Sequence, residues 1–275
     1  MHITYKNLKV AYRESGEGAC LVLLHGFCED STMWAEFMPI LAKKYRILAI
    51  DLSGFGNSDL LAEPSIEAMS TAVAALLHQK KILNCVMIGH SMGGYVSLAF
   101  AHKYGSMLSG LGLFHSHPYT DSEEKIKNRR KTISFIQRHG IAPFTGQFVR
   151  NLFAPTFAKS NELFLEELIY KTSMQHDDAV IAASTAMINR KDYSDTLTNL
   201  ACPALFIVGC QDNAIALQHS LAQLSLASVA SVHIFKDVGH MGMFEKKETC
   251  INIVADFVDF CVCFQNHQSL VGTTN

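Results

Sequence analysis

The sequence predicts an α/β fold in which helices flank a mostly parallel sheet of eight strands. Two observations carry this prediction: strand-like apolar runs alternate with helix-like segments near both ends of the chain, and a long central stretch has no strand pattern. Alternation of this kind is typical of parallel sheets, whose strands are joined by crossover helices. With 275 residues, 49% of them apolar, the chain is long enough to bury the core of one such domain.

The eight strands are expected where short apolar runs are bounded by turn residues. Two short strands open the chain, near residues 2–6 and 8–13. The core strands follow near residues 20–25, 46–50, 85–89, 108–114, 204–209 and 231–236. A last helix is expected to start near Phe244 and Glu245, and its apolar residues lie nearly all round, which indicates burial against the sheet or against a second subunit.

The strand pattern stops between Phe114 and about Asn199. Three segments of this stretch are expected to be helices separated by Gly and Pro, namely Lys125–Arg138, Glu162–Lys171 and Asp178–Arg190. We therefore expect residues 1–114 and 200–275 to form the core and residues 115–199 to form an inserted helical cap. Four phenylalanines of the cap could line an acyl pocket, although each is expected to pack in the cap's own core: Phe144, Phe148, Phe153 and Phe157.

A glycine-rich pentapeptide supplies a candidate nucleophile, Ser91. The run Gly89–Gly93 follows the apolar residues Cys85–Ile88 and opens the helix-like segment Gly94–Ala101. A serine at a sharp turn from strand to helix has its Oγ exposed, and the flanking glycines leave room for the turn; this is the nucleophile elbow motif. About 0.1 chance matches to the pentapeptide are expected in a chain of this length. The strand before Ser91 and the helix after it therefore carry the assignment.

Partners for Ser91 are expected downstream in the order carboxylate, then histidine, each on a loop after a later strand. Asp212 follows the predicted strand 204–209, and His240 lies on a glycine-flanked loop after strand 231–236. Imidazole, with an ordinary pKa near 6.5, can accept the Ser91 proton at neutral pH and later return it. Asp212 would hold the His240 ring in one tautomer and stabilise the imidazolium.

The turn after strand 20–25 supplies a candidate oxyanion hole. There the apolar run ends in His25-Gly26-Phe27, and Gly26 lets the backbone approach a substrate closely. We expect the backbone N–H of Phe27 and that of Met92, directly after the candidate nucleophile, to be the two donors.

In the order and spacing of these motifs, the chain resembles the α/β-hydrolase fold superfamily, and within it the serine esterases and lipase-like enzymes with a helical cap. The likeness covers nearly the whole length and includes the segments Asp51–Ser58 and Gly239–Glu245. It implies a serine hydrolase with the triad Ser91, Asp212 and His240. Members with Asp at the elbow resemble haloalkane dehalogenases or epoxide hydrolases, so Ser91 disfavours those two activities.

Three further histidines lie close to these motifs. His90 is expected to pack under the elbow, and His25 to brace the oxyanion loop by hydrogen bonding. His115 follows the sixth strand at the edge of the sheet that carries the site, where it could contact the substrate. Some superfamily members carry the triad acid at that place, and the sequence His115-Ser116-His117 there favours Asp212 as the acid.

Two other acidic residues are expected to have structural roles. Asp237 lies only three residues before His240 and is expected to cap a loop. Asp51 ends a strand, and the loop with Gly54 and Gly56 after it is expected to be a structural turn.

Charge and cysteine usage disfavour other classes of protein. The net charge is −2, and the mixed run 121–131 is expected to be a solvated helix face, so nucleic-acid binding is disfavoured. A signal peptide is not predicted, because the N-terminus has no basic segment followed by an apolar stretch, and a membrane span is not predicted, because no apolar run reaches 18 residues. The eight scattered cysteines fit reduced thiols in a cytoplasmic protein, and the pair Cys261 and Cys263 is expected to pack rather than bind metal. We expect no cofactor and no metal.

Several activities share this set of residues, and the fold does not choose among them. The first hypothesis is hydrolysis of a small carboxylic ester or related acyl bond through an acyl-enzyme on Ser91. Alternatives are hydrolysis of a C–C bond or enol lactone, perhydrolysis, acyl transfer, and a hydrolase-like receptor for a small ligand. Methionines near the predicted triad indicate an apolar acyl substrate: Met92, Met241 and Met243. A monomer and a homodimer both remain open.

Overall fold

The computed structural model describes the backbone of residues 1–272 and side chains as far as His267. Its eight strands form one sheet in the order β1-β2-β4-β3-β5-β6-β7-β8. Their bounds are β1 (His2–Tyr5), β2 (Leu8–Ser15), β3 (Cys20–Leu24), β4 (Arg46–Ile50), β5 (Cys85–His90), β6 (Leu108–Phe114), β7 (Ala204–Gly209) and β8 (Ala230–Phe235). Strand β2 pairs antiparallel with β1 and β4, and every other pair is parallel. The predicted mostly parallel sheet is confirmed.

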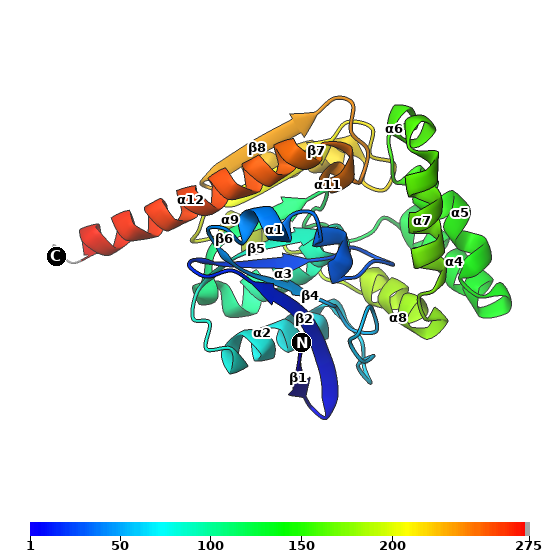
Figure 1. The fold of residues 1–275 in the computed structure, drawn as a ribbon, viewed down its shortest axis with the longest axis horizontal. Coiled ribbons are helices and arrows are strands. Elements are labelled where there is room, and N and C mark those ends of the chain that lie inside the picture. Colours follow the sequence, from blue (N-terminus) through cyan, green and yellow to red (C-terminus); the bar gives the residue numbers. More distant parts are fainter. Residues whose placement is uncertain (273–275) are drawn as a thin grey trace.

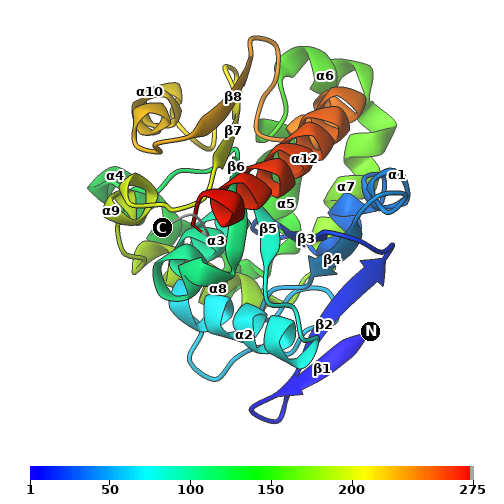
Figure 2. The same cartoon turned by 90° about the vertical axis from the view of Figure 1, so that its left-hand side faces the viewer.

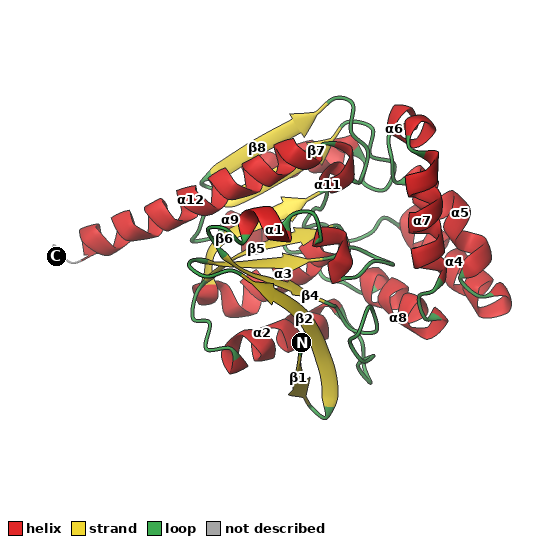
Figure 3. Ribbon diagram, in the orientation of Figure 1, coloured by secondary structure: helices red, strands yellow, loops and turns green. Residues whose placement is uncertain are grey.

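The inner strands are almost fully buried because helices cover both faces of the sheet (Figure 3). On one face lie α2 (Ile66–Gln79) and α3 (Met92–Tyr104), whose apolar side chains join one hydrophobic cluster. On the other lie α1 (Met38–Leu41) and the long α12 (Lys247–Gly272), which belong to a second cluster. Figure 2 shows α12 crossing in front of the sheet.

The C-terminal helical region differs slightly from the prediction. A short helix, α11 (Gly242–Glu245), comes first, and α12 begins only at Lys247. Phe257 and Val258 of α12 are buried, and the helix passes so close to Gly110 of β6 that a Cβ there would clash with Cys261 Sγ. Phe260 stays 44% exposed. The sheet therefore covers one side of α12. No helix within residues 1–272 is long and apolar enough to cross a membrane.

Five helices between β6 and β7 stand together at one end of the sheet (Figure 1). We call them the cap helices: α4 (Glu123–His139), α5 (Ala142–Asn151), α6 (Pro155–Ser160), α7 (Glu162–Ser173) and α8 (Asp177–Ile188). Local signals set their ends, since Ser122 Oγ accepts a hydrogen bond from the Lys125 N–H and Gly140 ends α4 with φ 73°. The division into a core of 1–114 and 200–275 and a cap of 115–199 stays a prediction.

The remaining helical pieces are short connections. They are α9 (Ser194–Thr198), α10 (Leu217–Ala222) and three 3₁₀ turns, η1 (Ser31–Trp34), η2 (Gly105–Met107) and η3 (Gln223–Ser225).

Parallel pairing brings the strand ends to one edge of the sheet. Leu24 of β3 pairs with Gly89 of β5, and His90 with Phe114 of β6. Gly209 of β7 pairs with Phe235 of β8. The loops after these strands therefore meet at the edge that faces the cap helices, as expected for a ligand site in an open α/β sheet.

Candidate active site

Ser91 forms the turn between β5 and α3 in a conformation that L-residues rarely adopt. Its φ is 50° and its ψ is −112°. The Ser91 N–H donates to the Phe114 carbonyl (3.0 Å), and Ser116 Oγ donates to the Ser91 carbonyl (2.8 Å). A Cβ on Gly89 would clash with the Gly93 carbonyl, so this turn tolerates no side chain there. The predicted strand-turn-helix context of Ser91 is present.

Two other residues with positive φ stand near Ser91. Cys28 (φ 62°) and His115 (φ 47°) follow β3 and β6, the strands on either side of β5. Backbone strain costs free energy and tends to cluster at functional sites. Three neighbouring strands therefore end in strained loops at the edge where the site was predicted.

Asp212 and His240 lie in direct contact. His240 Nδ1–H donates to Asp212 Oδ2 over 2.7 Å, while Oδ1 accepts the N–H groups of Ala214 (2.8 Å) and Ile215 (2.9 Å). Burial raises the pKa of Asp212, but the charge and hydrogen bond of His240, together with His115 and the Ile215 N–H, outweigh it and hold this pKa at about 2. Asp212 is therefore an anion at neutral pH, and Nε2 is the ring nitrogen of His240 left for chemistry.

The loop that carries His240 is fixed from both sides. The His240 N–H donates to the Leu152 carbonyl (2.7 Å), and His90 Nε2–H donates to the His240 carbonyl (2.9 Å). Glu245 accepts the N–H groups of Gly239 (3.0 Å) and of Met241 (3.2 Å). Sequence reasoning gave Glu245 no role, because its partners are backbone groups that no side-chain pattern indicates.

His115 lies behind Asp212 and does not line the cavity that Ser91 faces. Its Nε2 accepts the Gly242 N–H (3.2 Å), so the proton sits on Nδ1, 3.8 Å from Asp212 Oδ2. Burial lowers the pKa of His115 well below its usual range, which keeps the ring neutral. The expected substrate contact by His115 is therefore corrected: this ring is fully buried and faces the carboxylate of Asp212.

The two other predicted histidines behave as expected. His25 Nδ1–H donates to the Gly26 carbonyl (2.7 Å), and its Nε2 accepts the Leu52 N–H (2.8 Å), so it braces the loop after β3. His90 is buried below the elbow, with its ring centroid 4.9 Å from that of His240.

Glu29 is a residue that the sequence analysis missed. Its Oε2 accepts the Gly26 N–H (2.9 Å) and lies 3.1 Å from His90 Nδ1. Because His90 Nε2 already donates to a carbonyl, this second contact requires a proton shared between Glu29 and His90 Nδ1. Gly26 is necessary here, since a Cβ would lie 2.6 Å from both Glu29 Oε2 and His90 Nδ1.

The predicted oxyanion donors are unengaged in the part of the chain that the structure describes. Neither the Phe27 N–H nor the Met92 N–H donates to a protein acceptor there. Met92 is the first residue of α3, so its N–H has no preceding helical turn to bond to. The segments that carry these two donors pack closely against each other, because a Cβ on Gly93 would lie 2.6 Å from the Leu24 carbonyl oxygen.

Ser91 and His240 line one cavity of about 290 Å³ between the sheet edge and the cap helices. One part of its wall is apolar and consists of Phe27, Phe144, Phe148, Leu152, Met187, Ala214 and Ile215. The rest is polar and consists of Glu29, His90, Tyr95, Lys125, Asn128, Arg129, Thr132, Ser184 and Asn213. Of the residues from which apolar surroundings were expected, Phe144 and Phe148 line the cavity, whereas Met92, Met241 and Met243 do not.

The four cap phenylalanines divide into two pairs. Phe144 and Phe148 line the cavity, whereas Phe153 and Phe157 stack on each other with ring centroids 5.3 Å apart. The expectation that all four form cap core is correct for the second pair only.

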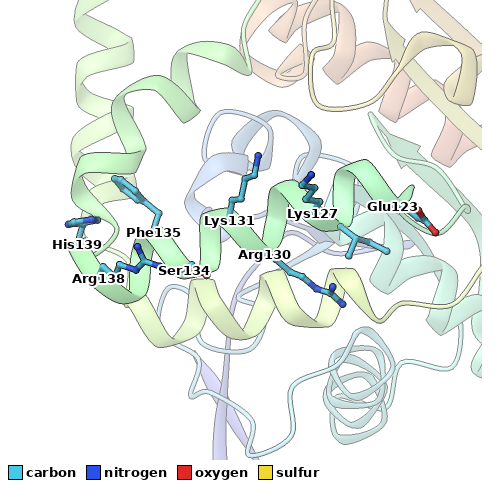
Figure 4. A pocket seen from close by; sticks show the side chains of 9 residues that line it. Glu123, Lys127, Arg130, Lys131, Ser134, Phe135, Arg138 and His139 are labelled. Atoms are coloured by element: carbon cyan, nitrogen blue, oxygen red, sulfur yellow. The ribbon is translucent and has the colours of Figure 1, made fainter.

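The charged run at the start of α4 is only partly a solvated face. Lys127, Arg130 and Lys131 are exposed, and they line an open groove on the outer side of the helix (Figure 4). Lys125 and Arg129 instead line the cavity. None of the residues around the outer groove lines the cavity with Ser91, so we place no chemistry in that groove.

Asp51 and Asp237 have structural roles. Asp51 accepts the N–H groups of Ser31 (2.8 Å) and Asn57 (2.9 Å), which confirms the structural turn. Asp237 is exposed, and its carboxylate forms an ion pair with Lys246 (2.7 Å). Within residues 1–272, no group of His, Cys, Asp and Glu side chains is arranged to hold a metal ion.

Comparison with known proteins identifies the family. The model of the alpha/beta hydrolase family matches residues 21–251. This chain belongs to that family. The 2-hydroxy-6-oxononadienedioate/2-hydroxy-6-oxononatrienedioate hydrolase of Escherichia coli K12 is 23% identical to this alpha/beta hydrolase, over 92% of each chain.

Solved structures agree with this assignment. A malate-bound thermophilic esterase from Thermogutta terrifontis is 28% identical and superposes with a TM-score of 0.89, over 95% of this chain and 98% of that one. The enol-lactonase from Burkholderia xenovorans LB400 is 20% identical with a TM-score of 0.87, over 94% of this chain and 100% of that one. The protein is accordingly an enzyme of the alpha/beta hydrolase class.

Proposed function

We propose that this alpha/beta hydrolase cleaves a small carboxylic ester or related acyl bond through an acyl-enzyme on Ser91. One observation carries the proposal: Ser91 and His240 line the same cavity, and Asp212 binds the far nitrogen of the His240 ring over 2.7 Å. A nucleophile, a base and a carboxylate that orients the base are the parts that acyl transfer requires.

In the proposed acylation step, Ser91 Oγ attacks the ester carbonyl carbon while His240 Nε2 takes the hydroxyl proton. The carbonyl π bond becomes the lone pair of an oxyanion, which would accept hydrogen bonds from the unengaged N–H groups of Phe27 and Met92. Collapse of this intermediate breaks the ester C–O bond, and His240 returns its proton to the leaving alkoxide. An alcohol departs, and the acyl group stays on Ser91.

Deacylation repeats these transfers with water as the nucleophile. The water oxygen attacks the acyl carbon, and one water proton moves to His240 Nε2. When the bond to Ser91 Oγ breaks, His240 returns that proton to the oxygen. The carboxylic acid leaves and the site is restored. Throughout, the anionic Asp212 stabilises the positive charge that forms on His240.

The similarity to the Thermogutta esterase supports ester hydrolysis as the first choice. The Escherichia coli hydrolase, named for 2-hydroxy-6-oxo dioates, supports an acyl or C–C substrate on the same residues as the alternative. Enol-lactone opening, perhydrolysis and acyl transfer would use the same residues. A receptor-like ligand binder would show one burst of product rather than many turnovers.

The experiment that tests the proposal is covalent labelling with a fluorophosphonate. We expect one adduct per chain, mapped by mass spectrometry to Ser91, because the phosphonyl group mimics the tetrahedral intermediate. The Ser91→Ala variant should take no label and should lose turnover of short-chain acyl esters. An adduct on another residue, or no adduct on a protein shown to be folded, would contradict the assignment.

A further inference from the structure

We propose that Arg129 and Lys125 of α4 form a carboxylate-binding subsite in the cavity of Ser91, so that the preferred substrate is an ester with a carboxylate at its far end. The inference rests on the proposed function and adds the class of substrate. Four observations on the cap helices carry it.

The first observation is the face that α4 turns to the cavity. Lys125, Asn128, Arg129 and Thr132 follow one another at spacings that place them on one side of a helix, and all four line the cavity. Apolar residues line the same cavity, among them Phe144 and Phe148 of α5. A ligand bound at Ser91 in this cavity therefore has both an apolar surface and the cations of α4 within the same walls.

The second observation is an excess of positive charge. The buried Asp121 has three cations around it: Arg129 Nε at 2.6 Å, Arg190 Nη1 at 2.9 Å and Lys125 Nζ at 3.8 Å. One carboxylate cannot neutralise three cations. Burial raises the pKa of Asp121, but these cations lower it by more, so Asp121 is ionised at neutral pH and two positive charges remain unbalanced.

The third observation concerns two nearby acids, Glu29 in the cavity wall and Asp212 behind His240, each of which already contacts a histidine through one carboxylate oxygen. Glu29 shares a proton with His90 and accepts the Gly26 N–H. Asp212 is paired with His240. Among the described residues, neither carboxylate forms an ion pair or hydrogen bond with Arg129 or Lys125, so the positive excess at α4 is left for a ligand.

The fourth observation is the availability of donors. Arg129 uses only Nε in hydrogen bonds among the described residues, so its two Nη groups have no acceptor there, and its side chain is 17% exposed. Arg190 differs: its Nε and both Nη atoms donate to the Tyr119 and Met187 carbonyls, and its side chain is 1% exposed. Arg190 is therefore a structural cation, whereas Arg129 can offer its planar pair of N–H groups to a carboxylate.

Matched substrates test the subsite. The first series contains ethyl hydrogen esters of dicarboxylic acids from succinate to suberate, each compared with the neutral ethyl alkanoate of equal chain length. The second contains acetate esters of ω-hydroxy acids, with the carboxylate on the alcohol side, compared with neutral alkyl acetates. We expect the wild type to favour the charged member at a particular chain length in one series, measured as a ratio of kcat/KM values.

Substitutions in α4 test whether Arg129 causes the preference for the charged ester. Arg129→Gln should lower the ratio of charged to neutral kcat/KM by roughly 10- to 100-fold, because hydrogen bonds between charged groups are lost. Arg129→Lys should give an intermediate value, since lysine keeps the charge but loses the two-pronged geometry. Arg130→Gln is the matched control, because Arg130 is the next residue but lines the outer groove of Figure 4. Its ratio should equal that of the wild type.

The outcomes separate this inference from the proposed function. A wild type that hydrolyses neutral esters and favours no charged ester in either series overturns the subsite and leaves the proposed function intact. Equal ratios for Arg129→Gln and Arg130→Gln also overturn it, and Arg129→Lys decides the matter if the Gln variant does not fold.

If Ser91 takes no fluorophosphonate and no ester is cleaved, the proposed function fails. Calorimetric binding of adipate, lost in the Arg129 variants, would then support the subsite, and binding that is absent or independent of Arg129 would overturn it.

Discussion

At the scale of single residues, two aspartates close to His240 differ sharply in what they contact. Asp212 is buried and holds His240 Nδ1, whereas Asp237 is exposed and pairs with Lys246. We expect Asp212→Asn to reduce turnover by about 10⁴-fold, since an amide favours the wrong imidazole tautomer. The fold should persist, because the amide oxygen can still accept the N–H groups of Ala214 and Ile215.

Asp237→Asn is the control for this prediction, and it should change turnover very little. Steady-state kinetics on both variants, with thermal unfolding to check the fold, measure the difference. A larger loss in Asp237→Asn than in Asp212→Asn would mean that the acid is misassigned.

Residue roles were predictable where the chain itself carries the signal. Ser91, Asp212 and His240 each follow a strand, so strand ends and glycines indicated them before any contact was known. The positions of His115 and Glu29 depend on contacts across the sheet edge. His115 does follow a strand at that edge, but its ring faces Asp212 and does not line the cavity. No local pattern distinguishes the two directions.

At the scale of elements, the β5–α3 turn depends on glycines for contact between backbones. We expect Gly89→Ala to destabilise the protein by roughly 1–3 kcal/mol or more, because its Cβ would clash with the Gly93 carbonyl, which cannot move without shifting α3. Gly105→Ala at the end of α3 is the matched control: nothing lies within 4 Å of its Cβ, and its φ of −55° suits alanine.

Urea unfolding of the two variants measures the difference, and fluorophosphonate labelling of Ser91 reports on the turn itself. Equal stability of Gly89→Ala and Gly105→Ala would show that the turn has room to relax.

Elements were predicted well where their apolar runs are buried on both sides. Every expected strand lies within two residues of its observed bounds. The signal is clearest for β5, β6 and β7, because the composition of a fully buried strand differs from that of its flanking turns. Three of the five cap helices were predicted by pattern, namely α4, α7 and α8, whereas α5 and α6 were not, and neither were the faces that the cap helices turn inward. Phe148 of α5 faces the cavity while Phe157 of α6 stacks on Phe153, and only the packing of α5 and α6 decides this.

At the scale of the whole molecule, the two chain segments that join the cap helices to the sheet are tied to each other. Asp121 lies in the segment before α4 and Arg190 in the segment after α8, and they form an ion pair of 2.9 Å. Arg190 also donates to the Tyr119 carbonyl, and the Tyr193 N–H donates to the Pro118 carbonyl (2.9 Å). Asp121 therefore holds together the chain segments that enter and leave the cap. Protonation of Asp121 should accordingly lower the free energy of unfolding of the protein.

The sign of this effect follows from the direction of the pKa shift. Burial raises the pKa of Asp121, but Arg129, Arg190 and Lys125 lower it by more. The pKa of Asp121 in the folded protein therefore lies below its ordinary value of 3.8. A group with a lowered pKa contributes stability that is present above its unfolded pKa and is lost as the pH falls through its folded pKa. Asp212, with a pKa of about 2, contributes in the same direction.

We therefore expect Asp121→Asn to be less stable than the wild type at pH 7, because three cations lose their shared carboxylate. The difference should stay constant from pH 7 to pH 5. Below about pH 4 it should shrink, since the wild type loses the same charge by protonation while the variant has none to lose. Urea unfolding at each pH, with Asp237→Asn as an exposed reference, measures the difference in free energy. A difference that is unchanged or larger at pH 3 would mean that the carboxylate stabilises this junction through its shape and hydrogen bonds and that its charge contributes nothing.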